Sequence, residues 1–318
     1  MKISLVSFFC ILTNTTLWSQ SIFTVLQGAE SDSSFYHLEK INANKYWAGG
    51  EYGILKSIDT LGNVNNIDGF ENDGKSILVI KKVGDKVFVA TDNSLIYCYN
   101  LKTKLWQKKY FKQFENKCFY DFLELENGKI VVCGGTTGIA TGLKKIPNGF
   151  IGLLNFEDEK IDVIWKNKKK FVWSMTENEQ QLHAAVFNGF NSKIKSTYNL
   201  KQWKTTNKVK GLVHEINVLD NEMWFSGTKN IHYAKSGIYG LVNEGKTPKT
   251  ITKGGCVWSM SGAENNKFGV TNSGTLLNLQ THQQIRIPMA FTLYDLKFIS
   301  SQKLLIVGHG KGIYILNN

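Results

Sequence analysis

Ring-bearing side chains recur along this chain about every 43 residues, each near the start of a short apolar run. Six of seven repeats carry one, and polar groups often follow directly. Aromatic rings offer flat apolar surfaces to sugars and peptide side chains, while carboxylates and imidazoles orient polar groups. We therefore predict a ligand-binding site made of Tyr36, His37, Tyr120, Asp121, Trp173, His214, Glu215, Trp258, Tyr294 and Asp295. In the second repeat the two columns fall on Ile77 and Leu78.

Two other interpretations of these columns stay open. The aromatic residues can pack between neighbouring repeats, with the carboxylates accepting hydrogen bonds from backbone. Alternatively, Asp121, Glu215 and Asp295 can serve as an acid/base set, since glycoside cleavage needs two carboxylates facing across one bond. No separation can be read from sequence, so whether the chain is an enzyme stays undecided, and we assign no catalytic residue.

The chain shows no pattern typical of a metal or cofactor site. Its six histidines include no HExxH or other close pair at metal-ligand spacing. The glycine-rich Gly308-His309-Gly310-Lys311-Gly312 has no Ser or Thr after the lysine, so it predicts a hairpin turn rather than a phosphate loop. We predict no metal and no cofactor.

The elements that must position these residues are strands. Short runs rich in β-branched and aromatic residues alternate with Gly/Asn/Asp turns, and no long stretch keeps a helical period. The second run of each repeat ends in small residues, as in Val132-Cys133-Gly134-Gly135 and Phe225-Ser226-Gly227-Thr228, at intervals of 41, 44, 52, 41, 43 and 38. This period is typical of four-stranded propeller blades. We predict an all-β, seven-bladed β-propeller forming one domain over residues 20–318.

The chain ends predict how such a ring closes. The seventh repeat stops after about three strands, while the strand-like Ser21-Ile22-Phe23-Thr24-Val25-Leu26 precedes the first. A closed ring leaves no blade face unpaired. We expect this N-terminal strand to complete the last blade in a Velcro-type closure. The alternative is an N-terminal extension that packs elsewhere.

Two segments resemble a known group of proteins. Tyr46-Trp47-Ala48-Gly49-Gly50 followed by Lys56-Ser57-Ile58-Asp59, and the degenerate Asp-box Ser196-Thr197-Tyr198-Asn199-Leu200-Lys201-Gln202-Trp203, are similar to seven-bladed propellers of the sialidase-type (BNR/Asp-box) repeat group and to the photosystem assembly factor family that shares them. The resemblance implies the fold and transfers no activity. Sialidases clamp their substrate with several arginines, and this chain has only Arg286.

Charge and loop length indicate the kind of partner. The net charge is +12, yet 37 of the 38 basic residues are lysine, and the near absence of arginine argues against specific nucleic-acid recognition. The long third repeat predicts an extended loop from Gly134 to Gly149, a second candidate contact site. We predict a non-catalytic binding or assembly module for a protein or peptide, with carbohydrate as the second ligand class. The alternative is a carbohydrate-active enzyme, a glycan hydrolase or lyase.

The N-terminus predicts export. Lys2 precedes an apolar stretch from Ile3 to Leu12, which is too short to span a bilayer, so we predict a signal peptide over residues 1–19 and no transmembrane anchor. The mature chain would be periplasmic or extracellular. Cys98, Cys118, Cys133 and Cys256 then remain, and we expect most of them to be buried free thiols.

Overall fold

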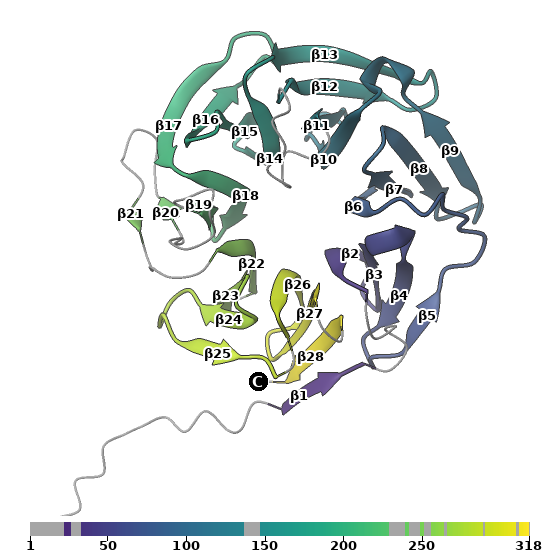
Figure 1. Ribbon diagram of the computed structural model, residues 1–318, viewed down its shortest axis with the longest axis vertical. Coiled ribbons are helices and arrows are strands. Elements are labelled where there is room, and N and C mark those ends of the chain that lie inside the picture. Colours follow the sequence, from purple (N-terminus) through teal and green to yellow (C-terminus); the bar gives the residue numbers. More distant parts are fainter. Residues whose placement is uncertain are drawn as a thin grey trace, which may run out of the picture.

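The apolar runs form strands that assemble into a ring of sheets (Figure 1). The computed structural model describes residues 22–26, 33–136, 147–228, 239–241, 249–250, 256–263, 266–288, 290–309 and 312–317. Over these residues the strands form seven four-stranded antiparallel sheets, numbered here as blades 1 to 7 from β2 onward. The predicted all-β propeller fold is confirmed. The described part of the chain contains no helix long and apolar enough to cross a membrane.

Blades 1 to 3 follow one another in sequence, each running from an inner to an outer strand. Blade 1 has β2 (Phe35–Asn42), β3 (Lys45–Gly50), β4 (Leu55–Asp59) and β5 (Val64–Asn66). Blade 2 has β6 (Ile77–Val83), β7 (Lys86–Thr91), β8 (Leu95–Asn100) and β9 (Trp106–Tyr110). Blade 3 has β10 (Lys117–Glu124), β11 (Ile130–Thr136), β12 (Gly149–Asn155) and β13 (Lys160–Asn167). Two single turns of 3₁₀ helix, Glu51–Gly53 and Lys112–Phe114, lie in connections.

Blades 4 to 7 keep this order. Blade 4 has β14 (Phe171–Asn178), β15 (Gln181–Phe187), β16 (Asn191–Thr197) and β17 (Lys204–Lys210). Blade 5 has β18 (Leu212–Leu219), β19 (Glu222–Thr228), β20 (Tyr239–Leu241) and β21 (Lys249–Thr250), and blade 6 has β22 (Val257–Ala263), β23 (Asn266–Thr271), β24 (Thr275–Asn278) and β25 (Gln284–Arg286). Blade 7 has β26 (Thr292–Ser300), β27 (Lys303–His309), β28 (Ile313–Asn317) and β1 (Ile22–Val25).

Blade 7 draws its strands from both ends of the described chain. β1 pairs antiparallel with β28, from Ile22 opposite Asn317 to Val25 opposite Tyr314, and is the outermost strand of the sheet. Phe23 and Val25 pack against the apolar cluster between blades 6 and 7. The expected N-terminal strand therefore lies at the expected sheet edge (Figure 1).

The core consists of layers between blades rather than one central mass. The described residues form seven apolar clusters, and each cluster joins two neighbouring sheets. One of them packs Leu305 and Val307 of blade 7 against Phe35 and Leu38 of blade 1. Each fully buried large apolar side chain contributes about 1.5–3 kcal/mol, so all seven contacts stabilise the ring. The four predicted thiols are buried and free.

Glycine in the second strand has a structural reason that sequence alone left open. A Cβ at Gly50, Gly134, Gly227 or Gly308 would collide with a backbone carbonyl oxygen of the inner strand's entry, that of Ser34, Cys118, Leu212 or Thr292. The inner strand can approach so closely only because these positions lack a side chain. These glycines thus mark where the inner strands of blades 1, 3, 5 and 7 begin, whereas Thr91, Val186 and Thr271 occupy the equivalent position in the other three blades.

Candidate functional site

A β-bulge interrupts every inner strand close to its start. In β2, Phe35 pairs with Gly50 and His37 with Gly49, which leaves Tyr36 without an opposite residue. Equivalent register shifts occur in the six other inner strands. A bulge takes one side chain out of the regular alternation and re-aims it. The residues placed at the shifts are Tyr36, Leu78, Tyr120, Trp173 with Ser174, His214, Trp258 and Tyr294.

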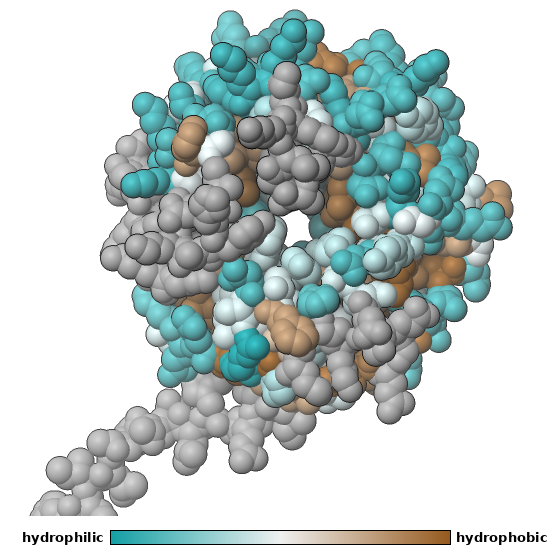
Figure 2. Space-filling model, in the orientation of Figure 1, coloured by the Kyte–Doolittle hydropathy of each residue, from teal (hydrophilic) through white to brown (hydrophobic). Residues whose placement is uncertain are grey.

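The predicted aromatic column forms a continuous arc of six rings. Tyr120 stacks on Trp173 with ring centroids 4.7 Å apart, and His214 lies 5.5 Å from Trp173 and 4.0 Å from Trp258. Trp258 then contacts Tyr294 at 5.5 Å, and Tyr294 contacts Tyr36 edge-on at 5.1 Å. The inner strands that carry the arc surround the opening at the centre of the ring, which Figure 2 shows passing through the molecule.

The arc is broken at blade 2, where the sequence register was wrong by one residue. Ile77 pairs with Thr91 and is fully buried in the layer between blades 1 and 2, whereas Leu78 occupies the bulge. Val79, not Leu78, therefore corresponds to His37 and Asp121. The apolar run Ile77-Leu78-Val79-Ile80 gives no alternation from which a bulge position can be read, because every residue in it is apolar.

Three ring nitrogens in the arc are buried without a partner. Both nitrogens of His214 and the Nε1 of Trp258 have no hydrogen-bond partner among the described residues. His214 is only 5% exposed. A buried polar group left unpaired costs about 1–3 kcal/mol, so these three atoms are sites at which a bound polar group would be stabilised.

The polar column next to the arc braces neighbouring blades. The Asp295 carboxylate accepts a hydrogen bond from the Leu38 backbone N–H at 2.8 Å, Asp121 accepts one from Met175 at 2.7 Å, and Glu215 accepts one from Met260 at 2.6 Å. Each bond runs from the backbone of the next blade to the carboxylate of the preceding one. The Ser174 hydroxyl accepts the corresponding bond from Ile216 at 3.2 Å. The carboxylates therefore contribute first to holding the blades in register.

Charges continue further along the same strands, at positions that the sequence reasoning missed. Lys297 Nζ lies 3.3 Å from Asp295 Oδ1, and Glu39 accepts a hydrogen bond from the Lys82 N–H at 2.9 Å. Burial lowers the pKa of the Lys297 amine, but Asp295, Glu215 and Glu39 outweigh burial and hold that pKa above its ordinary value. Glu39, Lys81 and Lys297 share one column, two residues beyond His37, Val79 and Asp295. Extending the sequence column by one alternation finds Glu39 and Lys297, but in the second repeat it reaches Ile80 instead of Lys81, because the register there was wrong by one residue.

Burial sets the protonation of the other polar groups around the channel. It raises the pKa of Glu215 to about 8 and that of Asp121 to about 6, in both cases against the pull of a nearby lysine. The pKa of Asp295 is instead lowered: burial raises it, but Lys297 and His37 outweigh burial. Burial also lowers the pKa of His37 to about 4 and that of His214 to about 3, so both imidazoles are neutral at pH 7. The channel near the arc thus presents neutral rings beside a lysine–carboxylate network.

Polar groups also gather where blade 7 meets blade 1. The Tyr36 hydroxyl donates to Glu51 Oε1 at 2.8 Å, and Glu51 Oε2 accepts from the Ser34 N–H at 3.1 Å. Ser34 Oγ lies 2.8 Å from His309 Nδ1. Exposed rings flank the cluster, since Tyr52 is 75% and Phe291 65% exposed. Glu51 and these two rings were not among the predicted contacts.

Three other sequence predictions concern the long loop, the signal peptide and the degenerate Asp-box. Most of the second candidate contact loop, residues 137–146, and the signal peptide over residues 1–19 lie outside the described residues. Within the described residues no group of three His, Cys, Asp or Glu side chains is arranged to hold a metal ion. The predicted degenerate Asp-box forms the turn between β16 and β17, where Asn199 Oδ1 accepts from the N–H groups of Lys201 and Gln202.

Comparison with known proteins finds similar structures but no matching family or curated sequence. No protein-family model matches the chain, and no curated protein matches it. Among solved structures it is similar to the extracellular domain of the hybrid two-component system BT3049 from B. thetaiotaomicron, with a TM-score of 0.67 and 14% identity. That alignment covers 90% of this chain but only 40% of the other. It is also similar to YCF48 from Cyanidioschyzon merolae, with a TM-score of 0.65 and 12% identity; that alignment covers 93% of this chain and 98% of the other. The structure of YCF48 bound to D1 peptide gives the same TM-score of 0.65 and 12% identity, over 93% of this chain and 94% of the other. At these identities the likeness shows a β-propeller and no more.

Proposed function

We propose that this chain is an exported, non-catalytic, seven-bladed β-propeller that binds a protein or peptide partner at the aromatic arc of its central channel. The pairing of β1 with β28 would close the ring, and the predicted signal peptide would bring the mature chain, from residue 20, to the periplasm or the medium. The ligand contacts we propose are the ten residues of the two columns. The observation that carries the proposal is the arc of six contacting rings with its unpartnered His214 and Trp258 nitrogens.

Protein partners are favoured over a reaction because of how the carboxylates are used. Asp121, Glu215 and Asp295 each accept a hydrogen bond from the next blade's backbone, so they support the ring whether or not a substrate is present. The YCF48 structure with D1 peptide gives a protein of similar fold with a peptide bound. BT3049 supplies a similar domain that is extracellular, which agrees with export.

The role of the arc in partner binding can be tested by removing two of its rings and measuring which proteins the immobilised chain still retains. The mature chain would be immobilised and exposed to an envelope extract of its source. We expect the double variant Trp173→Ala with Trp258→Ala to lose the proteins that the wild type retains, since it removes two of the six rings. Trp106→Ala is the matched control, because Trp106 lies on the outer strand β9 and packs against Trp47. Recovery of the same proteins by the folded double variant would overturn the proposed site.

A finer variant isolates the unpartnered donor. Trp258→Phe keeps an aromatic ring and removes the Nε1–H. If a partner group accepts from this N–H, affinity should fall about three- to tenfold, the usual worth of one hydrogen bond. Unchanged affinity would limit the role of Trp258 to ring contact.

Carbohydrate is the second candidate, favoured by one observation. The nearly parallel Tyr120 and Trp173 rings, with an interplanar angle of 10°, leave flat apolar surface of the kind that stacks on sugar faces. A glycan array probed with the wild type and the Trp173→Ala variant tests it. Cleavage of any glycan by the wild type, lost when Asp121, Glu215 and Asp295 are replaced by Asn or Gln, would instead support the enzyme alternative.

A further inference from the structure

The basic charge of this chain is concentrated in one part of the ring. Residues 101–210, which span blades 3 and 4 and the end of blade 2, hold 20 lysines against ten acidic residues, while residues 1–100 hold eight lysines against ten. Some lysines, inside and outside this range, are neutralised locally: Lys86 pairs with Glu157 at 2.6 Å and Lys108 with Asp73 at 2.7 Å. The net charge of +12 therefore arises mainly from one side of the ring.

Four lysines in or just before blade 4, Lys170, Lys193, Lys195 and Lys208, are not neutralised in this way. Lys193 of β16 lies directly opposite Lys208 of β17 in the strand register. Like charges in such a cross-strand pair are destabilising. Lys195 follows Lys193 on the same face of β16, and burial, then Lys170 and Lys193, lower the pKa of its amine. None of these four lysines forms an ion pair with a carboxylate of the described residues, whose ion pairs lie elsewhere.

Protection of a sheet edge explains only part of this pattern. Lysines on an outer strand discourage pairing with another chain, which accounts for Lys204 and Lys208 of β17. β16 is an interior strand, paired on both sides by β15 and β17, so edge protection does not account for Lys193 and Lys195. Blade 4 thus carries a stability cost that the fold does not require.

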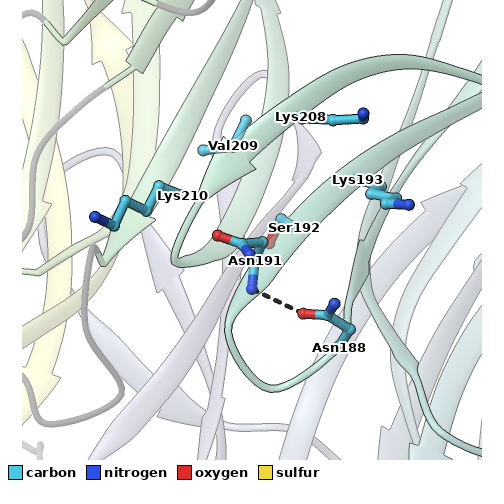
Figure 3. Close-up of a pocket in the computed structure, with 7 residues that line it drawn as sticks. All are labelled: Asn188, Asn191, Ser192, Lys193, Lys208, Val209 and Lys210. Carbon is cyan, nitrogen blue, oxygen red and sulfur yellow. Dashed lines mark hydrogen bonds between the residues drawn. The ribbon is translucent and has the colours of Figure 1, made fainter.

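A cavity opens beside this pair. It has a volume of about 380 Å³ and is lined by Asn188, Asn191, Ser192, Lys193, Lys208, Val209 and Lys210. Figure 3 shows Lys193 and Lys208 extending toward the same side of the hairpin, while Asn191 N donates to Asn188 Oδ1 at 2.8 Å. In the adjoining turn, Phe190 is 77% exposed. Cationic groups, amides and one exposed ring therefore lie close together.

The basic loop before β14 connects this region to the aromatic arc. The carbonyl of Lys168 accepts from the Asn148 N–H at 3.0 Å, and that of Lys170 accepts from the Gly149 N–H at 2.6 Å. The loop is therefore held against blade 3 by its backbone, and its side chains are left to solvent or to a ligand. Three residues after Lys170 the chain reaches Trp173 of the arc.

We propose that Lys168, Lys170, Lys193, Lys195 and Lys208 form a docking surface for an acidic peptide segment of the partner. This inference rests on the proposed function and names the chemistry of the partner: carboxylates on blade 4, beside a group that enters the arc. Flexible lysines suit dispersed carboxylates, whereas a nucleic-acid surface would use arginine for bidentate contacts. The acidic segment offsets the repulsion between Lys193 and Lys208.

The experiment titrates labelled poly-L-glutamate of about 20 residues against the mature chain at low salt. Because the attraction is between exposed charges, we expect binding that weakens as salt is added. Lys193→Glu with Lys195→Glu should weaken binding about tenfold or more, since two favourable contacts become repulsive. Lys201→Glu with Lys204→Glu is the matched control. It makes the same change of net charge in the same β-hairpin, at its other end, and should change binding less than about twofold.

A second measurement separates binding from folding. Lys193→Glu alone places a carboxylate opposite Lys208, so it should raise Tm by about 1–2 °C while it weakens poly-L-glutamate binding. A fall in Tm would mean that Lys193 has a structural role and would overturn the docking surface. Equal binding by the lysine double variant and its control would overturn it as well.

Two further titrations test the class of partner. Heparin and a single-stranded oligonucleotide of about 20 nucleotides are titrated at the same salt. Tighter binding of either by about tenfold would replace the acidic peptide by a sulfated glycan or a nucleic acid. Poly-L-glutamate has no aromatic group, so its binding should not depend on Trp173 and Trp258. Loss of partner recovery without loss of poly-L-glutamate binding, or the reverse, therefore shows which of the two proposals has failed.

Discussion

The central channel and the outer hairpin of blade 4 both carry several lysines, and they use them in opposite ways. In the channel, Lys297 is held by Asp295 at 3.3 Å within a set of carboxylates that also accept backbone hydrogen bonds. On blade 4, Lys193 and Lys208 face each other with no described carboxylate beside them. Buried charge is tolerated only when paired, whereas exposed charge can stay uncompensated at a modest cost. The channel charges therefore serve the ring, and the blade 4 charges remain for a partner.

Breaking the channel network should have the largest effect. Asp295→Ala leaves the partly buried Lys297 amine without its nearest carboxylate and removes the buried acceptor for the Leu38 N–H and the Ser259 hydroxyl. We expect a loss of about 3–5 kcal/mol in the free energy of unfolding, measured by urea denaturation. Glu157→Ala, which breaks the exposed pair with Lys86, should cost at most about 1 kcal/mol. Similar losses in both variants would remove the distinction between the two regions.

The next largest loss of stability should come from filling the close contact between an inner strand and the glycine opposite its start. Gly308→Ala places a Cβ against the Thr292 carbonyl at the start of β26 and should cost about 1–3 kcal/mol through overpacking. Gly262→Ala is the control, because its Cβ would meet only ordinary contacts from 3.4 Å outward. Urea denaturation of both variants decides the point, and a neutral Gly308→Ala would show that β26 can retreat without loss.

The channel should also give a pH dependence that blade 4 does not. Because burial raises the pKa of Glu215 to about 8, folding favours its protonated form, and this stability is lost as pH rises through 8. Between pH 7 and 9 the wild type should lose about 1 kcal/mol more than Glu215→Gln. The control is Glu124→Gln, which removes an exposed carboxylate and should follow the wild type. Parallel pH profiles of wild type and Glu215→Gln would place the Glu215 carboxylate in solvent.

Salt should act weakly, and mainly on blade 4. Raising ionic strength screens the repulsion between Lys193 and Lys208, so the Tm of the wild type should rise by about 1–2 °C from low to high salt. Lys193→Glu should show a smaller or opposite change, since it replaces repulsion by attraction. An equal salt response in both proteins would mean that the two side chains avoid each other.

The β-propeller and the aromatic column were predictable because both recur. Each blade repeats one local pattern of runs and turns, and six bulge positions carry rings that can be aligned by counting. The second strand of each blade lies at the run that the repeat in the sequence predicted. The Asp121, Glu215 and Asp295 column was also found, although three interpretations of it remained: ligand contact, hydrogen bonding to backbone and acid/base chemistry.

Tertiary structure decided what counting left open. Whether Ile77 or Leu78 occupies the bulge depends on pairing with Thr91, because an all-apolar run carries no alternation. The carboxylates became braces only when the next blade brought its N–H groups within 2.6–2.8 Å. Lys193 and Lys208 lie 15 positions apart in the chain, and only the hairpin register sets them face to face. A sequence states which groups recur, but strand register and contacts between sheets depend on residues distant in the chain, so the partners of each charge appear only in the folded ring.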